Sequence, residues 1–169
     1  MKPILAIDPG ASGGFAWQDS GGKVHCIPMP QTEDDVILFI RSRSCDGCAV
    51  TLEKVGGFIS GSRGMGSSMF NFGMNFGIIK ASAICFGMPL TLVTPQRWQK
   101  EITDKRKKDF NYEAVLTKGK NKGKTVIKNN WKEHLVSRAQ CLFPQVQNIS
   151  LKTADALLIL HYAKLNIQS

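Results

Sequence analysis

The feature that most constrains the fold is a pair of short strand-like runs that each end on an acid. Residues 4–7 are apolar and run directly into Asp8, and residues 49–53 form a second run that closes on Glu53. Between them, residues 33–43 predict a helix, with an acidic first turn and apolar residues on one side. A helical crossover makes the strands that it joins parallel. We therefore expect Asp8 and Glu53 at the same edge of one sheet.

The remaining pattern predicts a mixed sheet within a single domain, residues 1–169. Glycine-containing turns separate the first strand from two return strands, so the chain begins with an antiparallel meander. The order of elements is typical of the α/β class, with a five-stranded sheet flanked by helices, although the pattern alone fits several α/β folds. The further strands are expected at 13–17, 23–27 and 89–93, and the further helices at 69–86, from Thr94 through Trp98, at 131–143, and after Ser150.

A third acid, Asp155, lies early in the last predicted helix, between Ala154 and Ala156. Such small neighbours allow a helix to pack tightly against a sheet. An acid on the inner face of an apolar helix is costly unless it is paired or bound to a metal. Mg²⁺ prefers oxygen ligands, and a pair of such ions can activate water in phosphodiester hydrolysis. The three acids therefore predict a divalent metal site made by Asp8, Glu53 and Asp155.

Each acid also has an ordinary explanation. Asp8 begins a common turn sequence with Pro9 and Gly10. Glu53 is placed to pair with Lys54, and Asp155 is placed to favour the N-terminus of a helix. Only the three together, in elements that converge on one sheet edge, favour a site.

The net charge of +9 indicates a polyanionic partner, usually nucleic acid. The charge is concentrated in a basic insert at residues 104–128, which holds nine Lys or Arg and three acids. Few aromatic residues accompany these cations, so we expect phosphate contacts rather than base readout. The expected phosphate-binding residues are Lys105, Arg106, Lys107, Lys108, Lys118, Lys120, Lys122, Lys124 and Lys128.

The cysteines and the hydropathy indicate a cytoplasmic protein. The five cysteines are odd in number and irregular in spacing, unlike a secreted disulfide framework. Cys45 and Cys48 form one CxxC, and with His25 and Cys26 upstream they leave a small zinc site open. The favoured interpretation is that Cys48 leads into a buried strand and Cys45 lies in a turn. No run resembles a signal peptide or a membrane span.

The acidic motifs resemble those of RuvC-type Holliday-junction resolvases, which belong to the ribonuclease H-like superfamily. The resemblance implies a ribonuclease H-like fold and a homodimer that cuts four-way DNA junctions symmetrically. It also implies Mg²⁺ as cofactor, with Mn²⁺ as a substitute, and assigns Asp8, Glu53 and Asp155 to metal-binding positions. The motifs are residues 4–10 with Gly13 and Gly14, residues 52–55 and residues 153–158, and the segments 67–73 and 93–98 resemble the bacteriophage branch. A phage-encoded enzyme would act in the host bacterial cytoplasm.

Two positions near these motifs are candidate functional residues. RuvC-type enzymes commonly carry an acid or a histidine three residues before the last aspartate, where this chain has Lys152. Residues i and i+3 share a helix face, so Lys152 either reaches the scissile phosphate as a catalytic group or points into solvent. The missing acid leaves the number of bound metals open. Phe58, five residues after Glu53, corresponds to an aromatic wedge that would stack on a junction base.

The helix at 69–86 is the expected dimer contact, because it mixes aromatic residues with glycine gaps. The same side chains would equally fill the core of one subunit, so both interpretations stay open.

The leading hypothesis is a structure-selective endonuclease that resolves Holliday junctions and related branched DNA by paired phosphodiester hydrolysis. A ribonuclease H-like nuclease acting on other branched DNA or on RNA–DNA hybrids is an alternative. A non-catalytic junction-binding protein is another, because Lys152 replaces an acid. The chain is too short for the two lobes of an actin-type ATPase.

Overall fold

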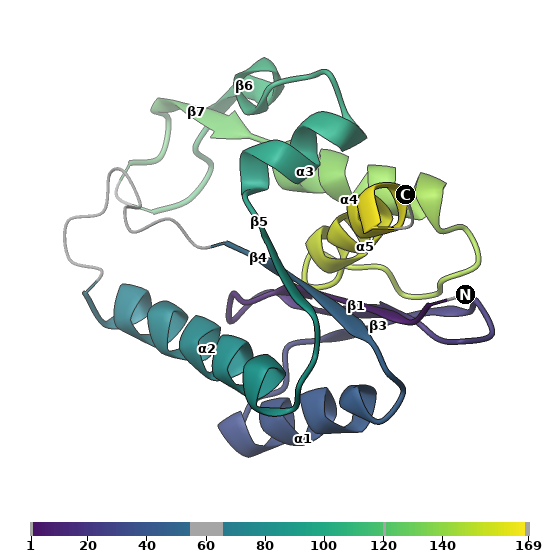
Figure 1. Ribbon diagram of the computed structural model, residues 1–169. Helices are drawn as coiled ribbons and strands as arrows, with labels where there is room; N and C mark the ends of the chain where they lie inside the picture. Colours follow the sequence, from purple (N-terminus) through teal and green to yellow (C-terminus); the bar gives the residue numbers. More distant parts are fainter. Residues whose placement is uncertain (1, 55–65, 120, 168–169) are drawn as a thin grey trace.

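A five-stranded sheet lies between two layers of helices (Figure 1). The computed structural model describes residues 2–54, 66–119 and 121–167. The strand order is β3-β2-β1-β4-β5, with β1, β2 and β3 antiparallel and β1, β4 and β5 parallel. The predicted mixed sheet is confirmed. The strands are β1 (Ile4–Asp8), β2 (Gly14–Gln18), β3 (Val24–Pro28), β4 (Ala49–Glu53) and β5 (Leu90–Val93), and the helices are α1 (Glu33–Ser44), α2 (Gly66–Cys85), α3 (Pro95–Ile102), α4 (Trp131–Leu142) and α5 (Ala154–Ile167).

The two faces of the sheet carry separate cores. Successive side chains of a strand point to opposite faces. In β1, Ile4 and Ala6 belong to a cluster with α3, α4 and α5, whereas Leu5 and Ile7 pack with α1 and α2. Figure 1 shows α1 and α2 on one side of the sheet and the other helices across from them. By the same alternation, Asp8 comes next on the side of α5.

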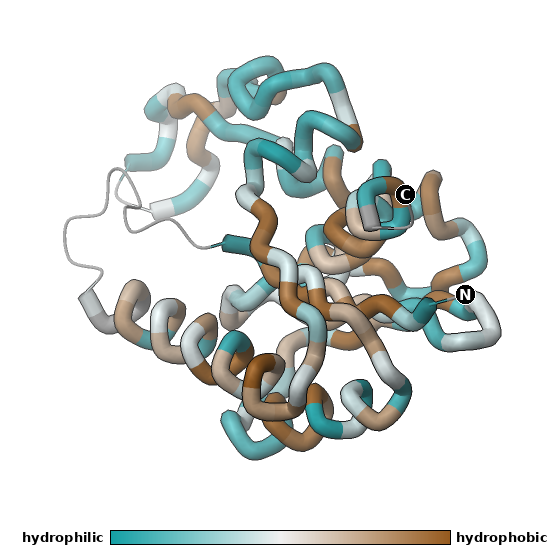
Figure 2. Tube along the Cα trace, in the orientation of Figure 1, coloured by the Kyte–Doolittle hydropathy of each residue, from teal (hydrophilic) through white to brown (hydrophobic). Residues whose placement is uncertain are grey.

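Helix α5 is the central element of its layer. Its residues 154–160 are all buried, and it packs on β1, β2 and β4 as well as on α3 and α4. A helix that is apolar all round is stable only when it is covered on all sides. Figure 2 shows hydrophobic colouring in α5 and in the central strands. In the described ranges, no helix combines the length and apolar character needed to cross a bilayer.

Two helix starts differ from the sequence prediction. Helix α2 begins at Gly66, earlier than the expected residue 69. Helix α5 begins at Ala154 rather than directly after Ser150, because residues 151–153 form a turn. The hydroxyl of Thr153 accepts a hydrogen bond of 3.0 Å from the backbone N–H of Ser150, which closes this turn.

The basic segment folds into a short hairpin that the sequence analysis did not predict. It contains a 3₁₀ turn, η1 (Lys107–Phe110), and the antiparallel strands β6 (Asn111–Val115) and β7 (Thr125–Asn129), which form their own two-stranded sheet. The amide of Asn129 donates to the carbonyl of Lys107 at 2.7 Å, and its side-chain oxygen accepts from the N–H of Trp131 at 3.0 Å. The base of the hairpin is therefore fixed to the start of α4.

Candidate active site

The sheet brings Asp8 and Glu53 to its carboxyl edge. In the parallel pairing of β1 with β4, Ile7 lies opposite Leu52, so the two acids that follow end neighbouring strands. Leu52 belongs to the core beneath α1 and α2, and strand alternation therefore turns Glu53 to the α5 side, as it does Asp8. Asp155, the second residue of α5, is buried with 9% of its side chain exposed. Helix α5 packs across β1 and β4, which places Asp155 over the same edge.

The turn after β1 fixes the carboxylate of Asp8. The N–H of Gly10 donates to Asp8 Oδ1 at 3.1 Å. Gly13 closes over the same side chain, since a Cβ there would lie 2.4 Å from the carbonyl oxygen of Asp8 and 2.7 Å from Oδ2. No larger residue fits this close approach without moving the acid. The resulting turn presents Asp8 in one orientation.

Glu53 is oriented by α3. The indole Nε1 of Trp98, which is fully buried, donates to Glu53 Oε1 at 2.9 Å. Glu53 and Lys54 are both described by the structure and form no ion pair, so the pairing considered from the sequence is wrong. A hydrogen bond to one carboxylate oxygen fixes the direction of the other, as outer partners do for metal ligands.

A lysine from α4 reaches the third acid. The ammonium group of Lys132 contacts Asp155 Oδ2, and the lysine side chain is still 59% exposed. The other carboxylate oxygen, Asp155 Oδ1, is buried and has no hydrogen-bond partner among the described residues. No hydrogen bond or ion pair among the described residues therefore offsets the burial of Oδ1.

Burial and mutual repulsion perturb the cluster. Burial, followed by the charge of Asp8, raises the pKa of Glu53 to about 7. Burial and the charge of Asp155 raise the pKa of Asp8. Burial acts to lower the pKa of Lys132, but the charges of Asp155, Asp8 and Glu53 outweigh it, so this pKa is raised. Carboxylates with raised pKa values beside a strongly held ammonium indicate a centre with excess negative charge.

The donor set fits a hard divalent cation. Asp8, Glu53 and Asp155 come from three elements and supply oxygen ligands, which Mg²⁺ prefers. The unpartnered Oδ1 of Asp155 and the raised pKa values of the other acids are both relieved by a bound cation. Over the described ranges, no three His, Cys, Asp or Glu side chains are spaced as a preassembled ligand group. In this structure the ammonium group of Lys132 contacts Asp155.

The structure changes the argument for Lys152. This exposed residue lies in the turn before α5, so the premise that it shares a helix face with Asp155 is wrong. A role at the scissile phosphate stays a prediction. Phe58 and Lys120 lie outside the described residues.

The predicted phosphate-binding cations are solvent-accessible. The described ones are all exposed, either ahead of β6 or on the hairpin and its connecting turn. Figure 2 shows mainly hydrophilic colouring in this part of the chain. The exposed members are Lys105, Arg106, Lys107, Lys108, Lys118, Lys122, Lys124 and Lys128.

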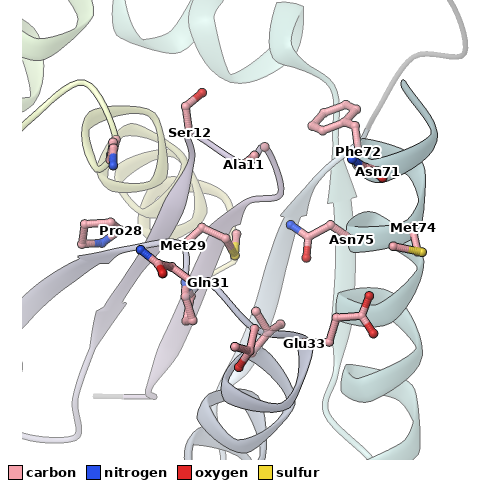
Figure 3. Close-up of a pocket in the computed structure, with 15 residues that line it drawn as sticks. Ala11, Ser12, Pro28, Met29, Gln31, Glu33, Asn71, Phe72, Met74 and Asn75 are labelled. Atoms are coloured by element: carbon pink, nitrogen blue, oxygen red, sulfur yellow. The ribbon is translucent and has the colours of Figure 1, made fainter. Parts of the chain in front are cut away.

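A cavity of about 870 Å³ opens beside the Asp8 turn. It is lined by residues 10–12, by residues 28–33 and by the first half of α2, and Figure 3 shows Phe72 and Asn75 of α2 facing the Ala11–Ser12 turn. The three acids are not part of its lining. The amide of Asn75 donates to the carbonyl of Pro9 at 2.6 Å, which ties α2 to the turn that holds Asp8.

The CxxC segment has the properties of ordinary structure. Cys48 is buried and leads into β4, and Cys45 is exposed in the turn after α1, as the favoured interpretation predicted. Burial, and then the charge of Asp46, raises the pKa of Cys48 to about 11. The raised pKa disfavours the thiolate, which is the form that ligates a metal.

Sequence reasoning missed Trp98 and Lys132 as residues of this site. Trp98 is separated from Glu53 by 45 positions, and a tryptophan in an amphipathic helix gives no sign of its polar partner. Lys132 did carry a signal, because a cation in the first turn of a helix opposes the helix dipole. Such a residue usually has a tertiary partner.

Comparison with known proteins identifies the fold. No protein-family model and no curated protein sequence matches the chain. Among solved structures, Thermus thermophilus RuvC in complex with a Holliday junction substrate has 14% sequence identity and a TM-score of 0.53, over 98% of this chain and 97% of that one. A second Thermus thermophilus RuvC structure has 15% identity and a TM-score of 0.49, over 96% of each chain. The chain therefore has the ribonuclease H-like fold of RuvC.

Proposed function

We propose that this protein is a metal-dependent endonuclease that resolves Holliday junctions and related branched DNA. The observation that carries the proposal is the gathering of Asp8, Glu53 and Asp155 at one sheet edge, with the pKa of Asp8 and of Glu53 raised. The RuvC fold supports the class of reaction. The junction bound to the Thermus protein supports the class of substrate.

The proposed site contains residues that would hold the metal and residues that orient those ligands. Asp8, Glu53 and Asp155 would hold Mg²⁺ or Mn²⁺, which supplies activated water and stabilises the leaving oxygen in phosphodiester hydrolysis. Gly10 orients Asp8, and Trp98 orients Glu53. Lys152 is placed at the rim of the neighbouring cavity, where its ammonium is proposed to face a backbone phosphate.

The exposed cations around the hairpin are proposed to bind DNA phosphates. They project from a segment whose base is anchored to α4, the helix that carries Lys132. Neutralised phosphates release counterions, so this binding is strong and depends on salt. Phe58 is proposed to stack on a junction base.

Helix α2 is proposed to join two subunits. Ile79 and Ala83 pack on the sheet, while Phe70, Met74 and Ile84 on the other face are exposed. Exposed apolar residues at this helical spacing favour an interface between helices. The two interpretations of α2 thus apply to different faces of one helix. A symmetric dimer would present two active sites to the two strands of a junction. We also propose a cytoplasmic site of action, in a bacterial host if the protein is phage-encoded.

Asp8→Asn tests the proposal. Purified wild type and variant are incubated with a four-way junction, a flap, a fork and an RNA–DNA hybrid, with Mg²⁺ or with EDTA. We expect the wild type to nick the junction only with Mg²⁺, and Asp8→Asn to lose at least about 1,000-fold in rate while still binding the junction. Asp34→Asn, an exposed acid on α1, is the matched control and should cut normally.

The outcomes separate the alternatives. Preferred cutting of the hybrid would identify a ribonuclease H-like activity. Junction binding without nicking in Mg²⁺ or Mn²⁺ would identify a binding protein. Cutting by Asp8→Asn at the wild-type rate would refute the site.

A further inference from the structure

The position of Lys132 is unfavourable unless its partner compensates for it. It is the second residue of α4, where the positive end of the helix dipole disfavours a cation. Its ammonium group nevertheless contacts Asp155 Oδ2 at the first turn of α5. The ion pair therefore joins the N-termini of two helices. The helix dipole favours the negative charge of Asp155 and disfavours the positive charge of Lys132.

The ion pair is not needed to hold the two helices together. Helix α4 packs on α5 through buried apolar residues, among them Trp131, Leu135 and Ala139. The lysine side chain runs outside this core and is 59% exposed. We therefore expect Lys132 to act through its charge on the three acids and not through packing.

Lys132 acts on the whole acid cluster. It lowers the pKa of both Asp8 and Glu53 through its charge, in addition to its contact with Asp155. Among the described residues it is the cation that influences all three acids. A single positive charge at this point does part of what a divalent metal would do.

We propose that the ammonium group of Lys132 is a placeholder that stands at Asp155 in the metal-free enzyme and withdraws when a divalent cation binds there. This inference rests on the proposed function. A divalent cation at the free Oδ1 of Asp155 would stand close to the ammonium group on Oδ2, and the two positive charges would repel each other. The lysine has a flexible four-carbon stem and an open path to water, so it can withdraw without unfolding α4. The charge of Lys132 reduces the repulsion among the metal-free acids and weakens metal affinity.

Calorimetric titration with Mn²⁺ in the absence of DNA tests the inference. Lys132→Met removes the competing charge and keeps the length of the side chain. We expect its dissociation constant for Mn²⁺ to fall by about 5-fold, as expected when one partly exposed ion pair need not be broken. The metal-free variant should melt at a lower temperature than wild type, and Mn²⁺ should raise its melting temperature by more.

Two controls separate charge from shape. Lys132→Arg keeps a cation at the same place, and its dissociation constant should stay closer to that of wild type than to that of Lys132→Met. Lys164→Met makes the same chemical change in the last turn of α5, away from the acids, and should leave the dissociation constant unchanged. If Lys132→Met does not fold without metal, Lys132→Gln replaces it in the same titration.

The results distinguish the inference from the proposed function. Equal or weaker Mn²⁺ binding by the neutral variants would overturn the placeholder and leave the nuclease proposal intact. Absence of Mn²⁺ binding by the wild type at millimolar concentration would overturn the metal site itself, and with it both proposals.

Discussion

At the scale of single residues, the site depends on the last residue of β1 and of β4, where an acid takes a position that faces α5. Asp8 and Glu53 are the last residues of β1 and β4 and face the α5 side, so the fold half-buries them where the alternation would otherwise place an apolar side chain. The raised pKa of Glu53 is the direct cost of that position. The acids are held in place before any metal binds.

This arrangement predicts how the stability of the metal-free protein depends on pH. The folded-state pKa of Glu53 is about 7, whereas an unfolded glutamate titrates near about 4.3. Between these values the folded protein binds more protons, so its free energy of unfolding falls as pH rises. We expect Glu53→Gln to remove about 2 kcal/mol of this pH-dependent loss between pH 5 and 8. Denaturant unfolding in EDTA measures it.

Glu33→Gln supplies the matched control, since Glu33 is an exposed residue of α1. Its unfolding free energy should follow the wild-type pH profile. A Glu53→Gln profile that is parallel to wild type would show that Glu53 ionises normally in the folded state.

At the scale of elements, α2 has two different faces. Ile79 and Ala83 are fully buried against the sheet, and Ile84 on the outer face is 58% exposed. The carbonyl of Pro9 and the amide of Asn75 form a direct link between this helix and the turn of Asp8. A second subunit bound to the outer face of α2 would therefore be separated from the Asp8 turn by this helix alone.

If α2 forms the proposed dimer contact, Ile84→Glu is expected to give a folded monomer. Burying a charge in an apolar interface costs several kcal/mol, whereas the same charge on a free helix face costs little. Light scattering after size exclusion gives the mass. Leu38→Glu changes an equally exposed residue, at 58%, on α1 and should leave the mass unchanged. A dimer that persists in Ile84→Glu would place the interface elsewhere.

The elements also show what the sequence could and could not predict. The alternation and the crossover predicted all five strands of the main sheet and the convergence of its acids. The hairpin of β6 and β7 was missed, because most of its residues are exposed and leave no pattern of buried and polar positions. The contacts of Trp98 and Lys132 were missed because they join residues 45 and 23 positions apart.

At the scale of the whole molecule, much of the exposed positive charge lies outside the five-stranded sheet and its helices. The excess of +9 includes the exposed cations of the hairpin region, whose base leads into α4 and Lys132. The exposed cations of the hairpin region and the acid cluster are thereby joined by one continuous stretch of chain. DNA held by the hairpin would lie near the carboxyl edge of the sheet.

The salt dependence of junction binding tests this arrangement. In an Asp8→Asn background, replacing Lys122 and Lys124 with alanine should reduce the slope of log affinity against log salt by about 2. Fluorescence anisotropy with a labelled junction measures the slope. Replacing Lys23 and Lys164, which lie away from the hairpin, removes the same charge and should change the slope by much less. Equal changes in the two double variants would mean that the hairpin makes no special contact.

The division of the interior into two cores has a consequence for how such a protein can change. Ile4 and Ala6 belong to the layer of α5, which carries Asp155, and Leu5 and Ile7 belong to the layer beneath α1 and α2. Substitutions in the layer of α1 and α2 that keep the hydrogen bond between Asn75 and Pro9 should leave the acids on the other face in place. The side chains of one core can therefore be replaced while those of the other are kept, because alternate residues of the same strands supply the two cores.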